Sequence, residues 1–243
     1  MSNKRIIATI NTIDNWVVQS IKFNKYLPIG RLNTSIEFLN RWNADEILIT
    51  DISGATLRSG GIKDIYQNIL KENFLPIGYS GGIKKFETVV KLFNAGFDKI
   101  CFNSCVFENR KLVEQTIDCF GRQSVILRCD YIEKDGGRFV YKHWAHEQSE
   151  SITEWFKLIK DINPSEVLLQ SVTRDGMKNG LDLGVANFTD CLNQIIILLG
   201  GVGTKEHITE AFNCENCHAV AVGNILHHKE LAYPNLNTRH KND

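Results

Sequence analysis

The segment LPIGYSGGIKKFETVVKLFNAGFDKICFNS, residues 75–104, contains the pattern that decides the fold. A short apolar run ends at the diglycine Gly81-Gly82, apolar residues then recur at helical spacing from Val89 to Phe93, and a second apolar run begins at Lys99. Near-continuous apolar strands on either side of a helix are typical of parallel pairing with both sheet faces covered. The segment therefore predicts a strand–helix–strand unit with parallel strands.

The same alternation of apolar runs and helical patterns continues along the whole chain. Eight runs are predicted as strands: Arg5–Ile10, Glu46–Thr50, Leu75–Tyr79, Lys99–Asn103, Val125–Asp130, Glu166–Ser171, Ile195–Leu199 and Ala219–Gly223. Eight such units in 243 residues predict an α/β fold, the TIM (β/α)8 barrel. A doubly wound sheet is the alternative, but it usually has fewer strands and an early GxGxxG, which this sequence lacks.

The two halves of the chain repeat one another. Gly81-Gly82 recurs as Gly200-Gly201, 119 residues later, and Asn103-Ser104 corresponds to Gly223-Asn224, 120 residues later. Duplication at half the chain length predicts a barrel built from two half-barrel repeats. No linker interrupts the pattern, so we predict a single domain over residues 1–243, with a short polar tail from about residue 234.

The composition excludes several classes of protein. The chain has 28 basic and 28 acidic residues, so nothing in its net charge attracts nucleic acid. No apolar run is long enough to cross a membrane and no signal peptide is visible, so we expect a cytoplasmic protein without membrane contact. The seven cysteines lack regular spacing, and we interpret Cys214-Glu-Asn-Cys217-His218 as coincidence rather than as a haem or zinc motif. Neither a metal nor a cofactor is expected.

Each diglycine follows a predicted strand and precedes a predicted helix. Backbone N–H groups at such a turn can approach an anion without a side chain intervening, and the helix terminus adds partial positive charge. The polar pair after the next strand can close the other side. We therefore predict two phosphate cups, the first formed by Gly81, Gly82, Asn103 and Ser104 and the second by Gly200, Gly201, Gly223 and Asn224. Plain tight turns are the alternative. Two cups suit an elongated phosphorylated ligand with an anion at each end.

Several motifs together resemble one family. They are Arg5-Ile6-Ile7-Ala8, Gly81-Gly82-Ile83, Asp98-Lys99 before Asn103, Ser171-Val172-Thr173-Arg174-Asp175-Gly176 with Gly180 and Asp182, and Gly200-Gly201. From Lys4 to about Leu226 the chain resembles the cyclase subunit of imidazole glycerol phosphate synthase, the HisF-type barrel. The resemblance implies a lyase of histidine biosynthesis that binds a glutaminase at the amino-terminal end of the barrel. Ammonia then travels along the barrel axis to a substrate with two phosphates, and two aspartates act as general acid and base.

The chain departs from the family at one of those two aspartates. The fifth-strand position is Asp130, but the first-strand position is Asn11, and a lysine of the family corresponds to Gln19. An amide cannot ionise, so Asn11 cannot transfer a proton as a carboxylate does. We therefore leave enzyme activity open: the residues fit a cyclase-like lyase subunit in which one catalytic position is degenerate. The alternative is that Asn11 arose by neutral drift in a cyclase that still works.

Four predicted strands begin with charged residues of both signs, Arg5, Glu46, Lys99 and Glu166. Inward charges at strand starts are costly unless they pair, and two positive and two negative residues can satisfy one another as a ring. The resemblance implies that these positions form the gate through which ammonia enters. Strand-entry charges that pair by chance are the alternative.

The resemblance also implies partners. Asp98 and Gln123 match family positions at the glutaminase interface. Similar diverged barrels accompany glutaminases in surface-polysaccharide clusters, where ammonia passes to an ATP-dependent sugar amidotransferase that forms an acetamidino sugar. The leading hypothesis is therefore a heterodimer of this chain with a HisH-like glutaminase for lipopolysaccharide O-antigen synthesis. A true cyclase and a non-catalytic scaffold that activates the glutaminase remain the alternatives. A related sugar-phosphate isomerase barrel is disfavoured by the four charges.

Four further residues are predicted in the substrate region at the carboxyl ends of strands: Asp51, Ser171, Thr173 and Asp175. A structural role in turns or loops is the alternative for each. Asp135-Gly136 predicts a hairpin inserted after the fifth strand. His143 and His146, which follow it, are predicted to be surface histidines.

Overall fold

A computed structural model describes residues 4–14, 16–42, 44–58, 62, 66, 69–71, 73–143 and 147–227. The predicted tail from residue 234 and His146 lie outside these residues.

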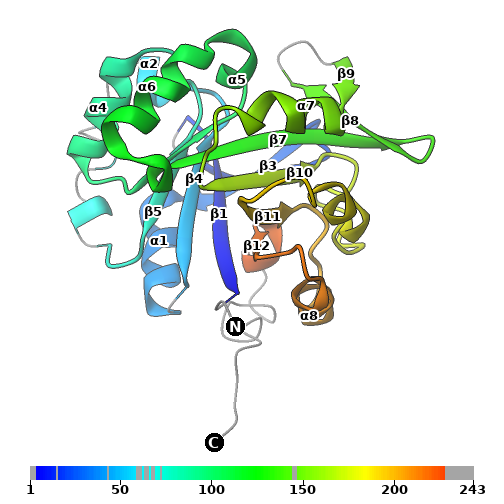
Figure 1. Ribbon diagram of the computed structural model, residues 1–243. Coiled ribbons are helices and arrows are strands. Elements are labelled where there is room, and N and C mark those ends of the chain that lie inside the picture. Colours follow the sequence, from blue (N-terminus) through cyan, green and yellow to red (C-terminus); the bar gives the residue numbers. More distant parts are fainter. Residues whose placement is uncertain are drawn as a thin grey trace, which may run out of the picture.

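Eight parallel strands form the barrel: β1 (Arg5–Ile13), β4 (Glu46–Asp51), β5 (Ile77–Ser80), β6 (Lys99–Phe102), β7 (Val125–Lys134), β10 (Glu166–Ser171), β11 (Ile195–Leu199) and β12 (Ala219–Val222). They pair in this order, and β12 closes the circle on β1. The predicted (β/α)8 fold is confirmed (Figure 1).

Every predicted strand overlaps a barrel strand, although some bounds differ. β5 begins at Ile77, two residues after the predicted start, because Pro76 cannot donate a hydrogen bond to a neighbouring strand. β1 and β7 run past their predicted ends, so Asn11 and Asp130 lie within strands rather than at their last residues.

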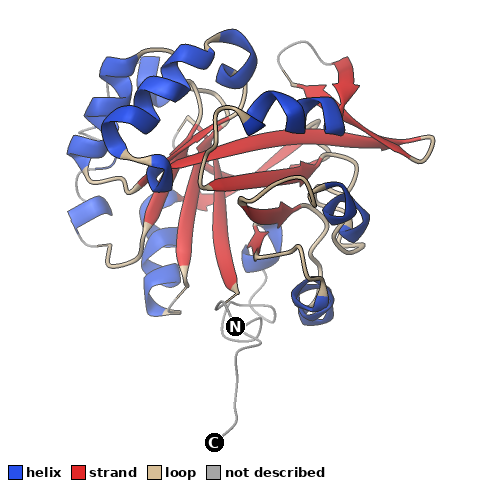
Figure 2. Cartoon of the chain, viewed as in Figure 1, coloured by secondary structure: helices blue, strands red, loops and turns tan. Residues whose placement is uncertain are grey.

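Helices cover the outside of the barrel (Figure 2). They are α1 (Leu32–Arg41), α2 (Ala55–Arg58), α4 (Phe86–Ala95), α5 (Cys105–Glu108), α6 (Arg110–Phe120), α7 (Ile152–Lys160) and α8 (Lys205–Asn213), with 3-10 turns η1 (Arg122–Ser124), η2 (Leu183–Phe188) and η3 (Asn224–His227). Helix α7 shows why these segments fold: Ser151 caps its first turn, and Trp155, Phe156 and Ile159 lie on one buried face. None of the helices in the described ranges could cross a membrane.

Two hairpins extend the barrel beyond the carboxyl ends of β1 and β7. After β1, the antiparallel strands β2 (Trp16–Ile21) and β3 (Lys25–Arg31) form an unpredicted hairpin. After β7, the strand β8 (Gly137–Lys142) returns through Asp135 and Gly136, and β9 (Glu147–Ser151) pairs with β8. Both turn residues have positive φ, 50° and 77°, as an Asp-Gly hairpin turn requires. The predicted insertion is therefore present.

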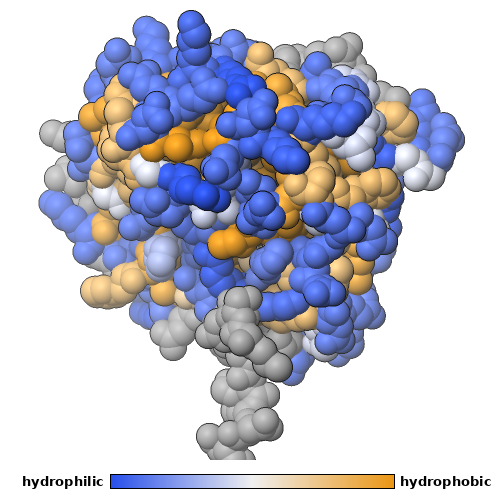
Figure 3. Space-filling model, viewed as in Figure 1, coloured by the Kyte–Doolittle hydropathy of each residue, from blue (hydrophilic) through white to orange (hydrophobic). Residues whose placement is uncertain are grey.

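Apolar side chains form two separate clusters. The larger lies between the strands and the helices. The smaller, called here the inner cluster, fills the inside of the barrel with Ile7, Leu48, Cys101, Ile126, Leu168, Ile197, Ala219 and Ala221. Figure 3 shows a largely hydrophilic outer surface on which hydrophobic residues form separate patches. The inner cluster matters for the site because polar residues lie on the same strands before and after it.

Candidate functional site

Four charged side chains form a closed ring at the amino-terminal end of the barrel. Arg5 donates from Nη1 to Oε2 of Glu46 and from Nη2 to Oε1 of Glu166, both at 3.0 Å. Lys99 Nζ lies 2.9 Å from Oε1 of Glu46 and 2.9 Å from Oε1 of Glu166. Each carboxylate therefore lies between both cations. This charge ring consists of the four residues predicted to meet there.

The strand register explains the ring. Its members are the first residues of β1, β4, β6 and β10, and the inner-cluster residues of these strands lie two residues further along, on the same inward face. Glu46 and Glu166 are 2% and 4% exposed, so their charges depend on the two cations. Burial raises the pKa of Glu46, while Lys99 opposes that shift. Oε2 of Glu166 is buried without a hydrogen-bond partner among the described residues.

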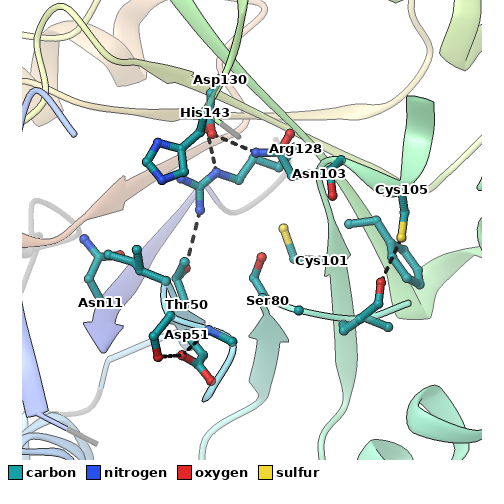
Figure 4. A pocket seen from close by; sticks show the side chains of 18 of the residues that line it. Asn11, Thr50, Asp51, Ser80, Cys101, Asn103, Cys105, Arg128, Asp130 and His143 are labelled. Carbon is teal, nitrogen blue, oxygen red and sulfur yellow. Dashed lines mark hydrogen bonds and ion pairs between the residues drawn. The ribbon is translucent and has the colours of Figure 1, made fainter. Parts of the chain in front are cut away.

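At the opposite end of the barrel, the mouth, lies a cavity of about 400 Å³ (Figure 4). Its wall includes seven residues predicted from the sequence: Asn11, Asp51, Gly81, Gly82, Asn103, Ser104 and Asp130. The first cup and both positions of the family's acid/base pair thus share one cavity. Whether this cup binds phosphate stays a prediction.

A second, smaller hollow of about 30 Å³ lies at the same end. It is lined by the whole second cup, Gly200, Gly201, Gly223 and Asn224, and by Asp175. Asn11 borders both hollows and therefore lies between the two cups.

Close backbone contacts supply a further reason for the diglycines. A Cβ on Gly81 would lie 2.1 Å from the carbonyl oxygen of Asp51, and one on Gly201 would lie 2.1 Å from that of Gly180. Both glycines also have positive φ, 121° and 98°. The turns require glycine whether or not an anion binds there.

Arg128 is the functional candidate that the sequence reasoning missed. It lies on β7 two residues before Asp130, on the same inward face, and is 6% exposed. Its Nε donates to Oδ1 of Asp130 at 2.7 Å, and its Nη1 lies 3.4 Å from Oγ1 of Thr50 on β4. Asn103 Nδ2 donates to Oδ2 of Asp130 at 2.7 Å. Both oxygens of this aspartate are therefore engaged by protein donors.

The signal for Arg128 was present in the sequence. A charged residue in the middle of an apolar strand, at period two from Asp130, points to the same side as that aspartate. Burial disfavours the charged guanidinium, but Asp130, together with Cys101 and Asp175, raises the pKa of Arg128.

Asp51 lies in the cavity wall, yet its carboxylate holds its own loop. Oδ1 accepts from Gly54 N and Ser53 Oγ, both at 2.8 Å, and Oδ2 accepts from Thr56 N at 3.1 Å. Tyr79 OH lies 3.3 Å from Oδ2. These contacts favour the turn role over direct ligand binding.

Asp175 connects the loop after β10 to the β2–β3 hairpin. Its Oδ2 accepts from Ser20 Oγ at 2.6 Å and from Phe23 N at 3.4 Å. Burial raises the pKa of Asp175 to about 6, although both hydrogen bonds oppose that shift. Its carboxyl group can therefore titrate near neutral pH.

Ser171 and Thr173 do not line either hollow. Ser171 Oγ lies 2.9 Å from Oε1 of Glu133, and Thr173 Oγ1 accepts from the backbone N of Glu133 at 3.1 Å. Arg174 binds the same carboxylate through Nε and Nη2, at 2.9 Å each. These residues fix the loop to the end of β7, which supports their structural alternative.

The prediction for His143 was wrong. It is half-buried, lies in the wall of the main cavity and meets Phe23 edge-on with ring centroids 5.8 Å apart. The β7–β9 insertion carries it there, which the sequence alone did not indicate.

Asp98 and Gln123 are both exposed at the end of the barrel that carries the charge ring. Asp98 precedes β6 and accepts from Ile77 N at 2.8 Å, and Gln123 precedes β7 and donates to Phe120 O at 3.1 Å. Their proximity to the ring is compatible with an interface there, which stays a prediction.

The Cys214–His218 motif has structural contacts of its own. The thiol of Cys217 is buried 3.5 Å from Ala219 O, and His218 Nδ1 accepts from Ile196 N at 3.1 Å. Within the described part of the chain, no group of three or more His, Cys, Asp or Glu is arranged to hold a metal ion.

The closed eight-stranded barrel, its inward charge ring and its two glycine-lined hollows define a class of (β/α)8-barrel proteins with a polar site at the mouth. The model of the histidine biosynthesis protein family matches residues 5–232, and the chain belongs to this family. A protein of Vibrio vulnificus provisionally named imidazole glycerol phosphate synthase subunit hisF2 is 31% identical over 93% of this chain and 84% of its own. Subunits named HisF are 29% identical in an Exiguobacterium strain, over 95% and 90% of the two chains, and 30% identical in Clostridium botulinum, over 96% and 93%. The chain is therefore HisF-like over nearly its whole length.

Proposed function

We propose that this chain is the barrel subunit of a glutamine amidotransferase complex. It pairs with a HisH-like glutaminase at the amino-terminal end of the barrel and conducts the released ammonia to an acceptor at the mouth. The acceptor is a phosphorylated small molecule or a sugar carried by a separate ATP-dependent amidotransferase, with acetamidino-sugar formation for surface polysaccharide as the pathway.

The charge ring carries the proposal. The ring contains two carboxylates and two cations, so its total charge is zero. Its ion pairs can therefore break and re-form without leaving a net charge inside the protein. The buried Oε2 of Glu166 is an acceptor without a partner among the described residues, and such an atom favours a site that receives a donor. An ammonia molecule supplies N–H donors of suitable size.

The inner cluster continues the path. Beyond the ring the inward residues are apolar, and neutral ammonia enters such surroundings at far lower cost than the ammonium ion. Polar residues resume at the next inward layer, where Thr50 and Gln170 lie and Arg128 reaches across to Thr50. A neutral donor that passes the cluster therefore reaches the cavity that Asn11 and Asp130 border.

The mouth supports an acceptor other than the cyclase substrate. An amide stands at position 11, and Asp130 is engaged on both oxygens by Arg128 and Asn103. Neither side chain is disposed for the paired proton transfer that the cyclase reaction needs. The hisF2 name of the Vibrio relative also fits a second, diverged copy of a HisF subunit.

The second candidate is a true imidazole glycerol phosphate synthase cyclase. The similarity to subunits named HisF in Exiguobacterium and Clostridium botulinum favours it. A non-catalytic scaffold that only activates the glutaminase is the third. For the scaffold alone, Asp130→Asn leaves the pathway intact.

The experiment combines the purified chain with the HisH-type glutaminase encoded in the same genome. We expect glutamine hydrolysis to rise at least about tenfold in the complex, and no imidazole glycerol phosphate to form from ammonium salts. Robust cyclase turnover by the unmodified chain would establish the second candidate instead. Asp98→Ala and Gln123→Ala test the interface through the glutaminase affinity.

Variants of the ring test conduction separately from binding. Glu166→Gln keeps the shape of the side chain but removes one charge, so we expect glutamine-derived nitrogen to reach the acceptor less efficiently while glutamine hydrolysis continues. Glu154→Gln on the exposed face of α7 is the matched control, because among the described residues Glu154 forms an ion pair only with the surface residue Lys157. Equal transfer in both variants contradicts the gate.

A further inference from the structure

Arg128 reaches across the inside of the barrel just beyond the inner cluster. It extends from β7 toward β4, and its guanidinium lies between Asp130 and Thr50 (Figure 4). Asn11 pairs with Thr50 in the strand register, so the amide at position 11 lies beside the same layer. The guanidinium is part of the cavity wall although the residue is 94% buried.

The hydrogen bonds of Arg128 leave most of its donor capacity unused. A guanidinium has five N–H donors. Nε donates to Asp130 and one donor of Nη1 faces Thr50, so three N–H groups, including both on Nη2, have no acceptor among the described residues. The edge formed by Nη1 and Nη2 is the one that binds a carboxylate or phosphate in bidentate fashion.

Asp130 fixes the orientation of this donor edge. Because Nε is bound to Asp130 Oδ1, the guanidinium plane is held and its free edge is directed away from that carboxylate. Asn103 in turn holds Asp130 through its other oxygen. Asp130 is then a positioning residue for Arg128.

The charges around the cavity do not oppose an anion. Two more cationic residues, Arg58 and Lys84, line its wall. With Arg128 these make three cationic residues against three acidic ones, Asp51, Asp130 and Glu108, so the formal charges of the wall balance, and Asp51 and Asp130 are also bound by protein donors. A buried guanidinium with unused donors strongly favours an oxyanion over bulk water.

We propose that Arg128 forms an oxyanion site in the wall of the main cavity, separate from the glycine cups. Its ligand is the phosphate or carboxylate group of a small molecule whose other end lies toward Gly81 and Gly82. This site does not require that the barrel conducts ammonia, and it can exist in any of the three candidate functions.

The test uses the chain alone, so its outcome is independent of the glutaminase. Inorganic phosphate, and acetate in a second series, are titrated while the arginine side-chain ¹⁵Nε–H signals are followed by NMR. The signal of Arg128 is the one missing in Arg128→Gln. We expect this signal to shift saturably with at least one of the two anions.

Arg128→Gln should weaken binding of that anion at least about tenfold, as expected for the loss of a charged hydrogen-bond donor. Arg138→Gln is the matched control, because Arg138 also binds an aspartate, Asp182, but lines neither hollow. Arg128→Lys, which keeps the charge without the planar fork, covers the case in which Arg128→Gln does not fold. A shift with phosphate alone or acetate alone identifies the anion class. An Arg128 signal unmoved by both anions, or equal affinity in Arg128→Gln and Arg138→Gln, overturns the proposal.

Discussion

Arg128 binds Asp130 through a 2.7 Å contact between Nε and Oδ1 inside the mouth of the barrel. The aspartate at the family's fifth-strand position is thus part of a buried ion pair, and Asn103 holds its second oxygen. The site departs from a proton-transfer pair at both positions, because Asn11 cannot ionise and Asp130 is engaged.

Restoring Asp at position 11 is therefore expected to be insufficient for cyclase activity. In Asn11→Asp, both oxygens of Asp130 still accept hydrogen bonds from Arg128 and Asn103, which compete with a substrate for the same carboxylate. We expect no detectable imidazole glycerol phosphate from ammonium salts with Asn11→Asp alone. The double variant Asn11→Asp, Arg128→Ala should exceed it at least about tenfold, since general acid–base catalysis supplies factors of that order or more. Equal turnover in the single and double variants contradicts a restraining role for Arg128.

The charge ring should also be visible in stability. Lys99→Met removes one of two cations that neutralise Glu46 and Glu166, and it leaves buried negative charge uncompensated. Loss of one partner of a buried pair costs about 3 kcal/mol or more in the free energy of unfolding. Urea denaturation measures this loss.

The control for the ring is Lys157→Met. Lys157 pairs with Glu154 at 2.8 Å, but both side chains are mostly exposed, so the expected change is below about 0.5 kcal/mol. Adding Glu166→Gln to Lys99→Met should recover part of the stability. If Lys99→Met unfolds like Lys157→Met, the ring contributes no compensation.

The barrel could be predicted from the sequence because its strands and helices each follow a local hydrophobic pattern. Each strand is a short apolar run and each helix has a buried face, as in α7. The Asp135-Gly136 turn was predictable for a similar reason, since it uses residues that accept positive φ. The β2–β3 hairpin was missed because its turn places Lys22 and Phe23 at φ of 50° and 54°, where neither residue gives a turn signal.

The site was less predictable than the fold. Positions at strand ends and in diglycines could be found from chain order, and Asn11, Asp130 and the first cup do share one cavity. Which side chains engage one another could not be found in that way. The contacts of Arg128 with Asp130, and of Asp51 with its own loop, depend on distances across the barrel that no sequence spacing encodes.

Stability should depend on pH through Asp175. Its pKa is about 6 in the folded protein and 3.8 in the absence of burial, so the folded state holds this proton more tightly than the unfolded state. The resulting stabilisation is complete below pH 4 and is lost as the pH rises through about 6. We expect the free energy of unfolding of the wild type, relative to Asp175→Asn, to fall by up to about 3 kcal/mol between pH 4 and pH 7.

Urea denaturation of both proteins across that range isolates this group, because the other carboxyl groups are common to both. A difference that stays constant or rises with pH contradicts the assignment. Asp175 is hydrogen-bonded to Ser20 and Phe23, so we expect ionisation of Asp175 to affect the attachment of the β2–β3 hairpin to the loop after β10.

We expect that a side chain at Gly81 destabilises the fold, whether or not a ligand binds there. A Cβ would lie 2.1 Å from the carbonyl oxygen of Asp51, and the backbone φ of 121° is one that other residues rarely adopt. The atoms that the Cβ would meet belong to the backbone of Asp51 and cannot move aside as a side chain can, so Gly81→Ala must displace the turn after β5 or the end of β4. We expect a loss of about 3 kcal/mol in the free energy of unfolding, measured by urea denaturation. Gly30→Ala is the matched control: Gly30 lies in β3, nothing lies within 4 Å of its added Cβ, and its change should stay within about 0.5 kcal/mol. Equal stability of the two variants would show that the turn can relax, which contradicts the steric requirement for glycine.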